Sequence, residues 1–529
     1  MRDVTQSSTL TAHRPSLARR VSRAILWNAL LVPLTGLVAL ASSVVVVRSL
    51  GQERYADYAL VLAAITSLTT YGDLGLSYTI PKFVPELERR GGTQAVRAFI
   101  AAVLGLKALL YLFVALPMLL APHWLFGFFQ LADQPWPVYA GIAAVTLLEA
   151  TAPVLHYFLS TLFEQKWTNT TKFVVSTLEP LLVILAALAG GGLAGIVAAM
   201  AAARGVRLGM LLWASRRALA MPAAGDVGTG EPESPTVHRG AVLTVRRFVA
   251  FSLFAYLDKL SSYFNSPAFV LVVLALYLGD REVALFSLAT SFLVRVMNFA
   301  LSPFTGIVMP LLTTAFASGD RTLPQRSFVL SSKAVALFAV PAATLLFGLA
   351  GQALPLLYGP QFAPAAELVQ ALTVLLLAEY VLSSGLVSSF LAAERYRDVI
   401  AARLVLFGSI PLLFLVVPRL GLFGATLLYG SARLVSVLLF LWLAHRRFGF
   451  TVPAQFTTRL LGAAAVSGGV LAVLAAALPR GYPVLAALTI LGVALFAACW
   501  KALGGLERTD RELLYQLDIP FKAQMARLL

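Results

Sequence analysis

Charged residues are scarce in this chain. Only 12% of its 529 residues are Asp, Glu, Lys or Arg, whereas 59% are hydrophobic, and the mean hydropathy is +0.83. Soluble domains carry about 25% charged residues, roughly twice this share. Apolar runs of about 20 residues, the length that spans a bilayer as a helix, recur between residues 24 and 503. The composition therefore excludes a soluble globular protein and indicates a protein that crosses the membrane many times.

Further absences narrow the class of protein. The apolar runs are continuous and do not alternate with polar residues, which favours helices over strands. The single cysteine, Cys499, cannot form an intrachain disulfide. No GxxxxGK[ST] motif occurs, and the longest predicted external loop, residues 121–135, carries no acidic pair suited to catalysis. We therefore expect an all-α polytopic membrane protein that is not an enzyme.

The spacing of the apolar runs predicts about fourteen transmembrane helices, in groups of six, six and two. A polar segment rich in Gly, Pro and acidic residues separates the first two groups and is typical of a flexible linker. The predicted organisation is a cytoplasmic tail at 1–23, a first lobe at 24–217, a cytoplasmic linker at 218–247, a second lobe at 248–447, two further spans at 448–504 and an amphipathic cytoplasmic tail at 505–529.

Acidic residues are few compared with basic ones: 25 Asp and Glu face 41 Lys and Arg, for a net charge of +16. If the amino terminus lies inside, roughly 30 of the Lys and Arg fall in cytoplasmic loops and tails and roughly 5 in external loops. The positive-inside rule accounts for the net charge better than nucleic-acid binding does. We expect both termini in the cytoplasm and no nucleic-acid partner.

The stretch at residues 55–87 has a partial copy later in the chain. It reads YADYALVLAAITSLTTYGDLGLSYTIPKFVPEL, and a related stretch, LFSLATSFLVRVMNFALSPFTGIVMPLL, occupies residues 285–312. Each copy follows a Leu-Gly turn of mixed charge, at 50–54 and at 278–282. Repeated halves in transporters place a binding site at the interface between them. The repeat therefore predicts two related lobes and a site between the lobes.

Ionisable residues inside the predicted spans are the candidates for this site. A charge near mid-bilayer costs about 3 kcal/mol or more unless it faces protein or water. The bases are Lys107, Arg204, Arg207, Lys259, Arg295 and Arg433, and the acids are Asp73, Glu149, Glu179, Asp258 and Glu379. Either these charges pair with one another and hold the helices in register, or they line a hydrated cavity for a charged ligand.

Helical spacing favours the cavity, because it groups polar side chains on single faces. Arg295 and Asn298 are three residues apart, whereas Asp258 and Asn265, and likewise Glu149 and His156, are seven apart. Arginines suit a pyrophosphate or an acidic sugar. A coupling proton would instead require a buried carboxylate, for which Asp258, Glu149 and Glu379 stay open. Asp258 and Lys259 either pair or, about 100° apart on a helix, face different neighbours.

The segment VVRSLGQERYADYALVLAAITSLTTYGDLGLSYTIPKFVPEL resembles the amino-terminal signature of the polysaccharide transporter family. That signature is an L-G-x-x-x-(Y/F)-(G/A)-x-(Y/F) turn, a span, and a D-L-G-L ending before a basic loop. LPLLYGPQFAPAAELVQAL, residues 354–372, resembles the family's segment entering span ten. The likeness covers nearly the whole chain in span count, linker position and motif order. The family, which includes the oligosaccharide flippases, belongs to the multidrug/oligosaccharidyl-lipid/polysaccharide (MOP) superfamily.

This resemblance implies a flippase of the bacterial inner membrane, which moves undecaprenyl-diphosphate-linked oligosaccharides for O-antigen lipopolysaccharide, capsule or exopolysaccharide. It implies two six-helix lobes in a V around a cationic cavity, with extra carboxy-terminal helices that guide the lipid. No cofactor is implied beyond coupling to H⁺, to Na⁺ or to the membrane potential. A polysaccharide polymerase or co-polymerase is an expected partner. The implied cavity residues are Lys107, Arg204, Arg207, Lys259, Arg295 and Arg433. The helical spacing, and not the resemblance, adds His156, Asn265 and Asn298 as polar lining.

Two related functions stay open. A cation-coupled multidrug or metabolite antiporter of the same superfamily typically has twelve spans, a dominant carboxylate and fewer cavity cations, so the predicted span count and the six bases argue against it. A flippase for the peptidoglycan precursor, lipid II, would share the fourteen spans and the cationic cavity. A membrane glycosyltransferase or polymerase would need acidic residues on a large external loop, which the sequence lacks.

Overall fold

The computed structural model describes residues 17–162, 165–220, 244–304, 308–318, 320, 322–393 and 395–505. Within these ranges the chain forms helices and no strand, which confirms the predicted all-α fold. Residues 1–16, most of the predicted linker, and the predicted amphipathic tail from residue 506 lie outside the described residues. The helices are α1 (Leu17–Asp73), α2 (Leu76–Leu120), α3 (Pro122–Gly127), α4 (Trp136–Thr161), α5 (Gln165–Leu188), α6 (Gly192–Ala220), α7 (Val245–Phe264), α8 (Pro267–Tyr277), α9 (Asp280–Leu301), η1 (Ser302–Phe304), α10 (Val308–Ala317), α11 (Leu323–Tyr358), η2 (Pro360–Phe362), α12 (Ala365–Ala392), α13 (Tyr396–Phe448), α14 (Ala454–Ala477) and α15 (Tyr482–Ala502).

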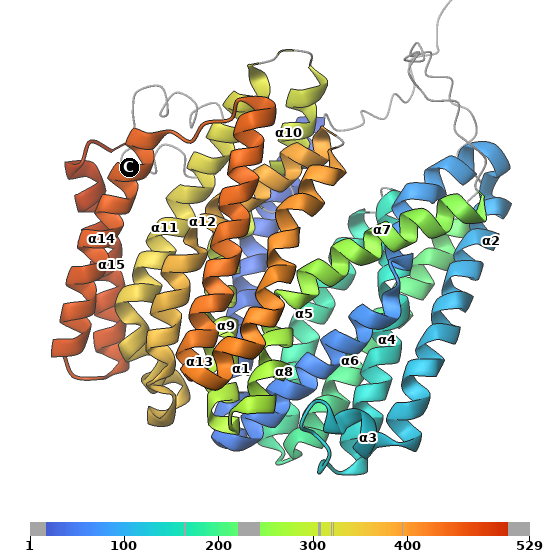
Figure 1. The fold of residues 1–529 in the computed structure, drawn as a ribbon, viewed down its shortest axis with the longest axis horizontal. Coiled ribbons are helices and arrows are strands. Elements are labelled where there is room, and N and C mark those ends of the chain that lie inside the picture. The colour runs from blue at the N-terminus through green and yellow to red at the C-terminus, as the bar shows by residue number, and fades with distance from the viewer. Residues whose placement is uncertain are drawn as a thin grey trace, which may run out of the picture.

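Eleven of the described helices are long and apolar enough to cross a membrane, and the bent pair α7 and α8 makes a twelfth. Two are far too long for one crossing of about 20 residues: the candidate spans in α1 and α13 have 39 and 52 residues. Each changes direction at a left-handed glycine, Gly51 (φ 74°) and Gly421 (φ 59°), a conformation that glycine adopts without steric cost. Figure 1 shows both helices as two arms diverging from a shared end. Counting the arms separately adds two crossings to twelve, which gives the fourteen predicted.

The helices form two groups (Figure 1), with α2 to α6 in one and α9 to α13 in the other, and α14 and α15 pack on α11. The first arm of α1 contacts the second group. Ser43 Oγ lies 2.9 Å from the hydroxyl of Tyr358 on α11, and Arg48 Nε donates to the carbonyl of Leu357 at 2.7 Å. Chain order therefore does not decide which group a helix contacts. The predicted domain boundaries and the cytoplasmic placement of the termini stay predictions.

The turn between α1 and α2 differs from the one that the sequence suggests. Pro81 favours a helix end and a basic loop there, but the chain turns earlier, at Leu74 (φ 44°) and Gly75 (φ 73°), and α2 continues through Pro81. A Cβ on Gly75 would lie 2.0 Å from the backbone oxygen of Ser252 on α7. Glycine is therefore required both for the left-handed backbone and for the close approach of α7.

The span predicted at 249–278 is broken. α7 and α8 meet at a bend of 52°, and the side chain of Ser266 caps α8 by accepting from the backbone N–H of Phe269. Pro267 occupies the first turn of α8, where its missing N–H costs no intrahelical hydrogen bond. The break exposes backbone carbonyls within a predicted membrane segment, where each needs a partner.

Candidate functional site

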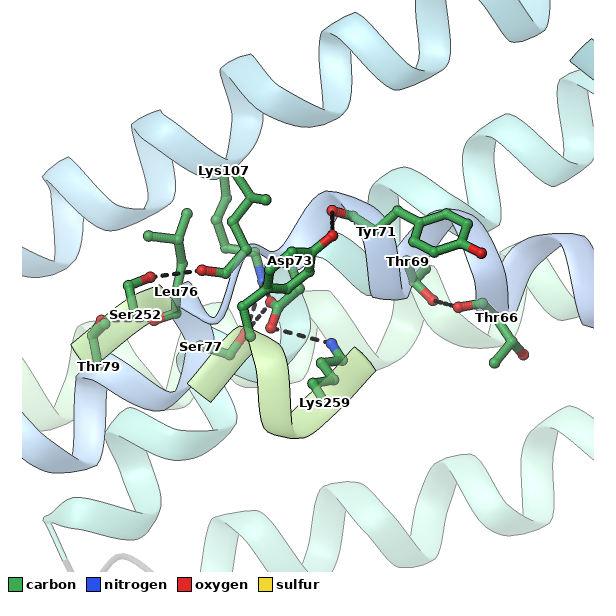
Figure 2. A network of polar contacts seen from close by, with 12 residues as sticks. Thr66, Thr69, Tyr71, Asp73, Leu76, Ser77, Thr79, Lys107, Ser252 and Lys259 are labelled. Carbon is green, nitrogen blue, oxygen red and sulfur yellow. Dashed lines mark hydrogen bonds and ion pairs between the residues drawn. The ribbon is translucent and has the colours of Figure 1, made fainter. Parts of the chain in front are cut away.

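The first cluster of predicted site residues surrounds Asp73, at the end of α1. Lys107 Nζ on α2 lies 2.5 Å from Asp73 Oδ1, and Ser77 Oγ donates to the same oxygen at 2.6 Å. Lys259 Nζ on α7 lies 3.1 Å from the other carboxylate oxygen. Figure 2 shows Lys107 and Lys259 approaching the carboxylate from separate helices. One carboxylate therefore joins α1, α2 and α7.

The turn after Asp73 explains why its carboxylate points inward. Gly72 packs against Tyr111, whose ring would lie 2.9 Å from a Cβ at that position. The Tyr111 hydroxyl donates to the carbonyl of Thr69 at 2.6 Å, and Ser252 Oγ on α7 donates to the carbonyl of Leu74 at 2.6 Å. These bonds hold the end of α1 between α2 and α7, and leave the side chains of Asp73 and Lys107 only 2% and 1% exposed.

The second cluster joins α4, α5 and α6. Arg204 lies 3.0 Å from Glu149 and 3.2 Å from Glu179, and Arg207 lies 2.9 Å from Glu149. All four side chains are partly buried. Arg204 and Arg207, three residues apart on one face of α6, lie together around these two carboxylates. His156, two turns beyond Glu149 on α4, is partly buried and contacts the ring of Tyr157.

The third cluster holds the broken span. Arg433 on α13 donates hydrogen bonds to both carboxylate oxygens of Glu379 on α12, with 2.6 Å between Nε and Oε2. Its Nη1 donates at 2.9 Å to the backbone carbonyl of Asn265, at the break between α7 and α8, and at 3.1 Å to the Tyr429 hydroxyl. The guanidinium thus supplies the partner that the freed carbonyl requires.

Asp258 and Lys259 do not pair with each other. Lys259 turns to Asp73, whereas Asp258 lies 2.6 Å from Nη1 of Arg403 on α13. The sequence allowed Asp258 and Lys259 either to pair with each other or to face different neighbours, and the second arrangement is the correct one. Sequence reasoning missed Arg403, although it falls inside the predicted span at 399–418, which is the signal that identified the other bases.

Arg295 on α9 differs from the other five predicted bases. Across the described ranges it forms no ion pair, and its buried Nη1 has no hydrogen-bond partner. Its guanidinium lies near the hydroxyls of Tyr58 on α1 and Tyr358 on α11, and Asn298, three residues further along, is exposed. Six bases minus the four acids that pair with them leave a surplus of two positive charges, one on Arg295 and one shared by the two lysines at Asp73.

Two of the hollows in the described second half of the chain bear on the site. A cavity of about 680 Å³ is lined by α12 and by residues of α9, α10 and α13, and it reaches Glu379, Arg403 and Arg433. A groove of about 580 Å³ between α11, α12 and α14 is almost wholly apolar, with Phe347 and Phe456 in its wall. In the described part of the chain, no group of three or more His, Cys, Asp or Glu side chains could hold a metal ion.

Comparison with known families identifies the chain. Residues 21–316, more than half of its length, match the family described as polysaccharide biosynthesis protein. The chain belongs to this family. No protein of curated function matches it.

Solved structures show which fold this member of the polysaccharide biosynthesis protein family adopts. The lipid II flippase MurJ in an inward closed conformation superposes with a TM-score of 0.65 at 14% identity, over 90% of this chain and 99% of that one. An inward-facing multidrug resistance MATE transporter of the MOP superfamily gives 0.59 at 15% identity, over 80% and 98%. A MOP superfamily transporter from Pyrococcus furiosus gives 0.56 at 15%, over 81% and 96%. The chain thus shares the fold of these MOP superfamily proteins, and its many long apolar helices indicate a multi-pass membrane protein.

Proposed function

We propose that this transporter is a flippase that moves undecaprenyl-diphosphate-linked oligosaccharide across the bacterial inner membrane, for O-antigen, capsule or exopolysaccharide. The observation that supports this most is Arg295, a half-buried arginine inside the α9 span whose guanidinium no acid neutralises among the described residues, and whose buried Nη1 has no hydrogen-bond partner. A charge in that position is costly and marks a ligand path. The remaining predicted bases are committed to carboxylates, so Arg295 is the base best placed to receive an anion.

The charge balance fits a diphosphate. The surplus on the six predicted bases is two positive charges, and a diphosphate that links a lipid to a sugar bears one negative charge on each phosphorus. An arginine donates to phosphate oxygens through two parallel N–H groups, which gives directional binding in a site that excludes water. A cationic drug would meet a positive surplus instead, which argues against the multidrug antiporter.

The apolar groove suits the polyprenyl tail. Its wall is formed by side chains such as Val340, Phe347, Leu377 and Leu460, from α11, α12 and α14. α14 belongs to the pair of spans that follows the two lobes, and these spans are the ones expected to guide the lipid. In this proposal the tail stays on the apolar surface while the head group crosses through the protein.

The carboxylates support a driving force other than ion binding. Asp73, Glu149, Glu179, Asp258 and Glu379 each contact a lysine or arginine, so each already has a positive partner in place of a coupling ion. A membrane potential that is negative inside favours outward movement of an anionic head group by about 2.3 kcal/mol per charge per 100 mV. We therefore propose the membrane potential as the driving force, with the amino and carboxyl termini in the cytoplasm.

The test is complementation of a bacterial strain that lacks its oligosaccharide flippase, read out as surface polysaccharide at matched protein abundance. Arg295→Ala is expected to abolish export, because it removes the anion's partner, and Arg480→Ala at an exposed position is the control. Full rescue by Arg295→Ala would show that Arg295 does not hold the substrate. Resistance to cationic dyes in place of rescue would favour the antiporter.

A lipid II flippase is the second candidate, because the fourteen predicted crossings and the fold shared with MurJ both fit it. The two functions are separated by depletion of the host's lipid II flippase. Growth that is restored by this chain would support lipid II as the substrate. Lysis despite restored surface polysaccharide in the first strain would favour the oligosaccharide.

A further inference from the structure

The cavity in the second half of the chain has features that the diphosphate does not explain. Its volume is about 680 Å³, and a smaller hollow of about 120 Å³ adjoins it. Both are lined by Glu379, Ser383, Val387, Arg403 and Arg433, so we treat them as one and name it the second-half cavity. Its size falls within the roughly 300–1,000 Å³ that is usual for small-molecule sites.

One face of α12 turns polar groups without partners into this cavity. Ser383, Ser384 and Ser388 line it, and the described structure gives their hydroxyls no hydrogen-bond partner. Ser389, which does not line the cavity, instead donates to the carbonyl of Gly385 at 2.7 Å, as serines in helices commonly do. The three lining hydroxyls are therefore available to a ligand.

Asn265 also presents a polar atom without a partner at this cavity. Its side chain lines the smaller hollow and is 4% exposed, with Nδ2 donating to Ser409 Oγ at 3.4 Å. Its Oδ1 is buried and has no hydrogen-bond partner. A buried acceptor without a partner costs about 1–3 kcal/mol, so this oxygen is expected to accept from a donor that enters the cavity.

The charges around the cavity indicate whether the ligand that carries this donor is charged or neutral. Glu379 is paired with Arg433, and Asp258 with Arg403, so two acids cancel two bases. A balanced site gives no net attraction to a free cation or to a diphosphate. It suits a neutral ligand rich in hydroxyls, for which Tyr380 and Tyr429 in the wall provide flat contact surfaces.

We propose that the second-half cavity is a sugar subsite, which binds neutral sugar residues of the lipid-linked oligosaccharide while Arg295 holds the diphosphate. The proposal rests on the function proposed above and adds to it the part of the chain that recognises the sugar residues. Asn265 and the three serines of α12 are the specificity-determining residues. Sugars differ in where their hydroxyls lie, so a different sugar would not form the same hydrogen bonds with these side chains.

The experiment uses the purified full-length protein in nanodiscs, incubated with a total lipid extract of its host cells. Mass spectrometry then measures the ratio of glycosylated to bare undecaprenyl diphosphate retained. The wild type is expected to enrich the glycosylated lipid about tenfold or more over the extract. Asn265→Leu and Ser384→Leu are each expected to bring the ratio close to that of the extract without reducing retention of the bare lipid. Ser389→Ala is the matched control on α12.

Each outcome decides a separate point. Enrichment that survives in both Asn265→Leu and Ser384→Leu would overturn the sugar subsite and leave a water-filled cavity. Equal retention of both lipids by the wild type would overturn it as well, while leaving the flippase intact. A wild type that retains neither lipid would instead overturn the flippase itself. Ser384 is exposed to the cavity, so its variant tests the proposal even where Asn265→Leu fails to fold.

Discussion

The Asp73 cluster and the Glu379–Arg433 pair place the same chemistry in two different settings. In the first, the side chains of Lys107 and Asp73 are 1% and 2% exposed and join three helices. In the second, the side chains of Arg433 and Glu379 are 27% and 22% exposed and border a cavity. The comparison teaches that a charged residue inside a span is a ligand-site candidate only where the packing leaves it access. A charged residue that the packing seals off serves to connect helices.

The largest expected effect is at the sealed cluster. Lys107→Met leaves the Asp73 carboxylate buried with only Lys259 as a charged partner, and losing one member of a buried ion pair costs about 3–5 kcal/mol. Thermal unfolding of the purified protein in detergent, together with its abundance in the membrane, measures this. Lys82→Met removes an exposed lysine of the same helix, which lies 5.8 Å from the centroid of the Phe251 ring, and is expected to cost about 1 kcal/mol or less. Equal effects of the two variants would contradict the sealed arrangement.

A smaller effect is expected at the cavity. Arg433→Met removes the partner of Glu379 and the donor to the Asn265 carbonyl, but water that enters the cavity can solvate both. We expect a loss of about 1–3 kcal/mol in the same unfolding measurement. A loss as large as that of Lys107→Met would mean that the cavity stays dry.

The double variant Asp73→Asn with Lys107→Met sharpens the comparison further. Removing both charges leaves no uncompensated carboxylate, so the double variant is expected to unfold with about 1–2 kcal/mol less destabilisation than the sum of the single variants. A double-mutant cycle on the unfolding free energies measures this coupling. Additive effects would show that the two residues act independently.

The smallest effect is expected for Lys259→Met. The Lys259 side chain is 29% exposed, and ion pairs that water reaches contribute about 1 kcal/mol or less. Asp73 keeps Lys107 and Ser77 at its Oδ1 atom in this variant, and Lys259 is lost only from Oδ2. Unfolding at low and at high salt provides the check, because an accessible pair weakens as salt rises. A loss above that of Arg433→Met would place Lys259 among the sealed residues.

Local features of the sequence predict much of this protein. Hydropathy locates the spans because the cost of burying a polar backbone in lipid acts on each segment separately. In the long helices α1 and α13, Gly51 and Gly421 mark the points where the direction changes. The turn at Leu74 cannot be located from Pro81, because it accompanies the close approach of Ser252, a residue 178 positions away.

The partners of the charges could not be predicted. The spacing along a helix shows which residues share a face, but not which helix lies opposite. Asp258 and Arg403 are 145 positions apart, and only the packing of α7 against α13 brings them together. That Arg295 has no acidic partner among the described residues was equally beyond the sequence, because it depends on every helix that surrounds α9.

By itself the sequence determined that this chain is an all-α membrane protein of about fourteen spans, with a repeat and a surplus of bases inside the bilayer. The tertiary structure alone decided which bases are neutralised, where the broken span receives its partner and where a cavity remains. The physical reason is the distance over which each interaction acts. Hydrophobic burial is set by each segment's own composition, whereas ion pairs and hydrogen bonds act over a few ångströms and exist only once distant helices have packed.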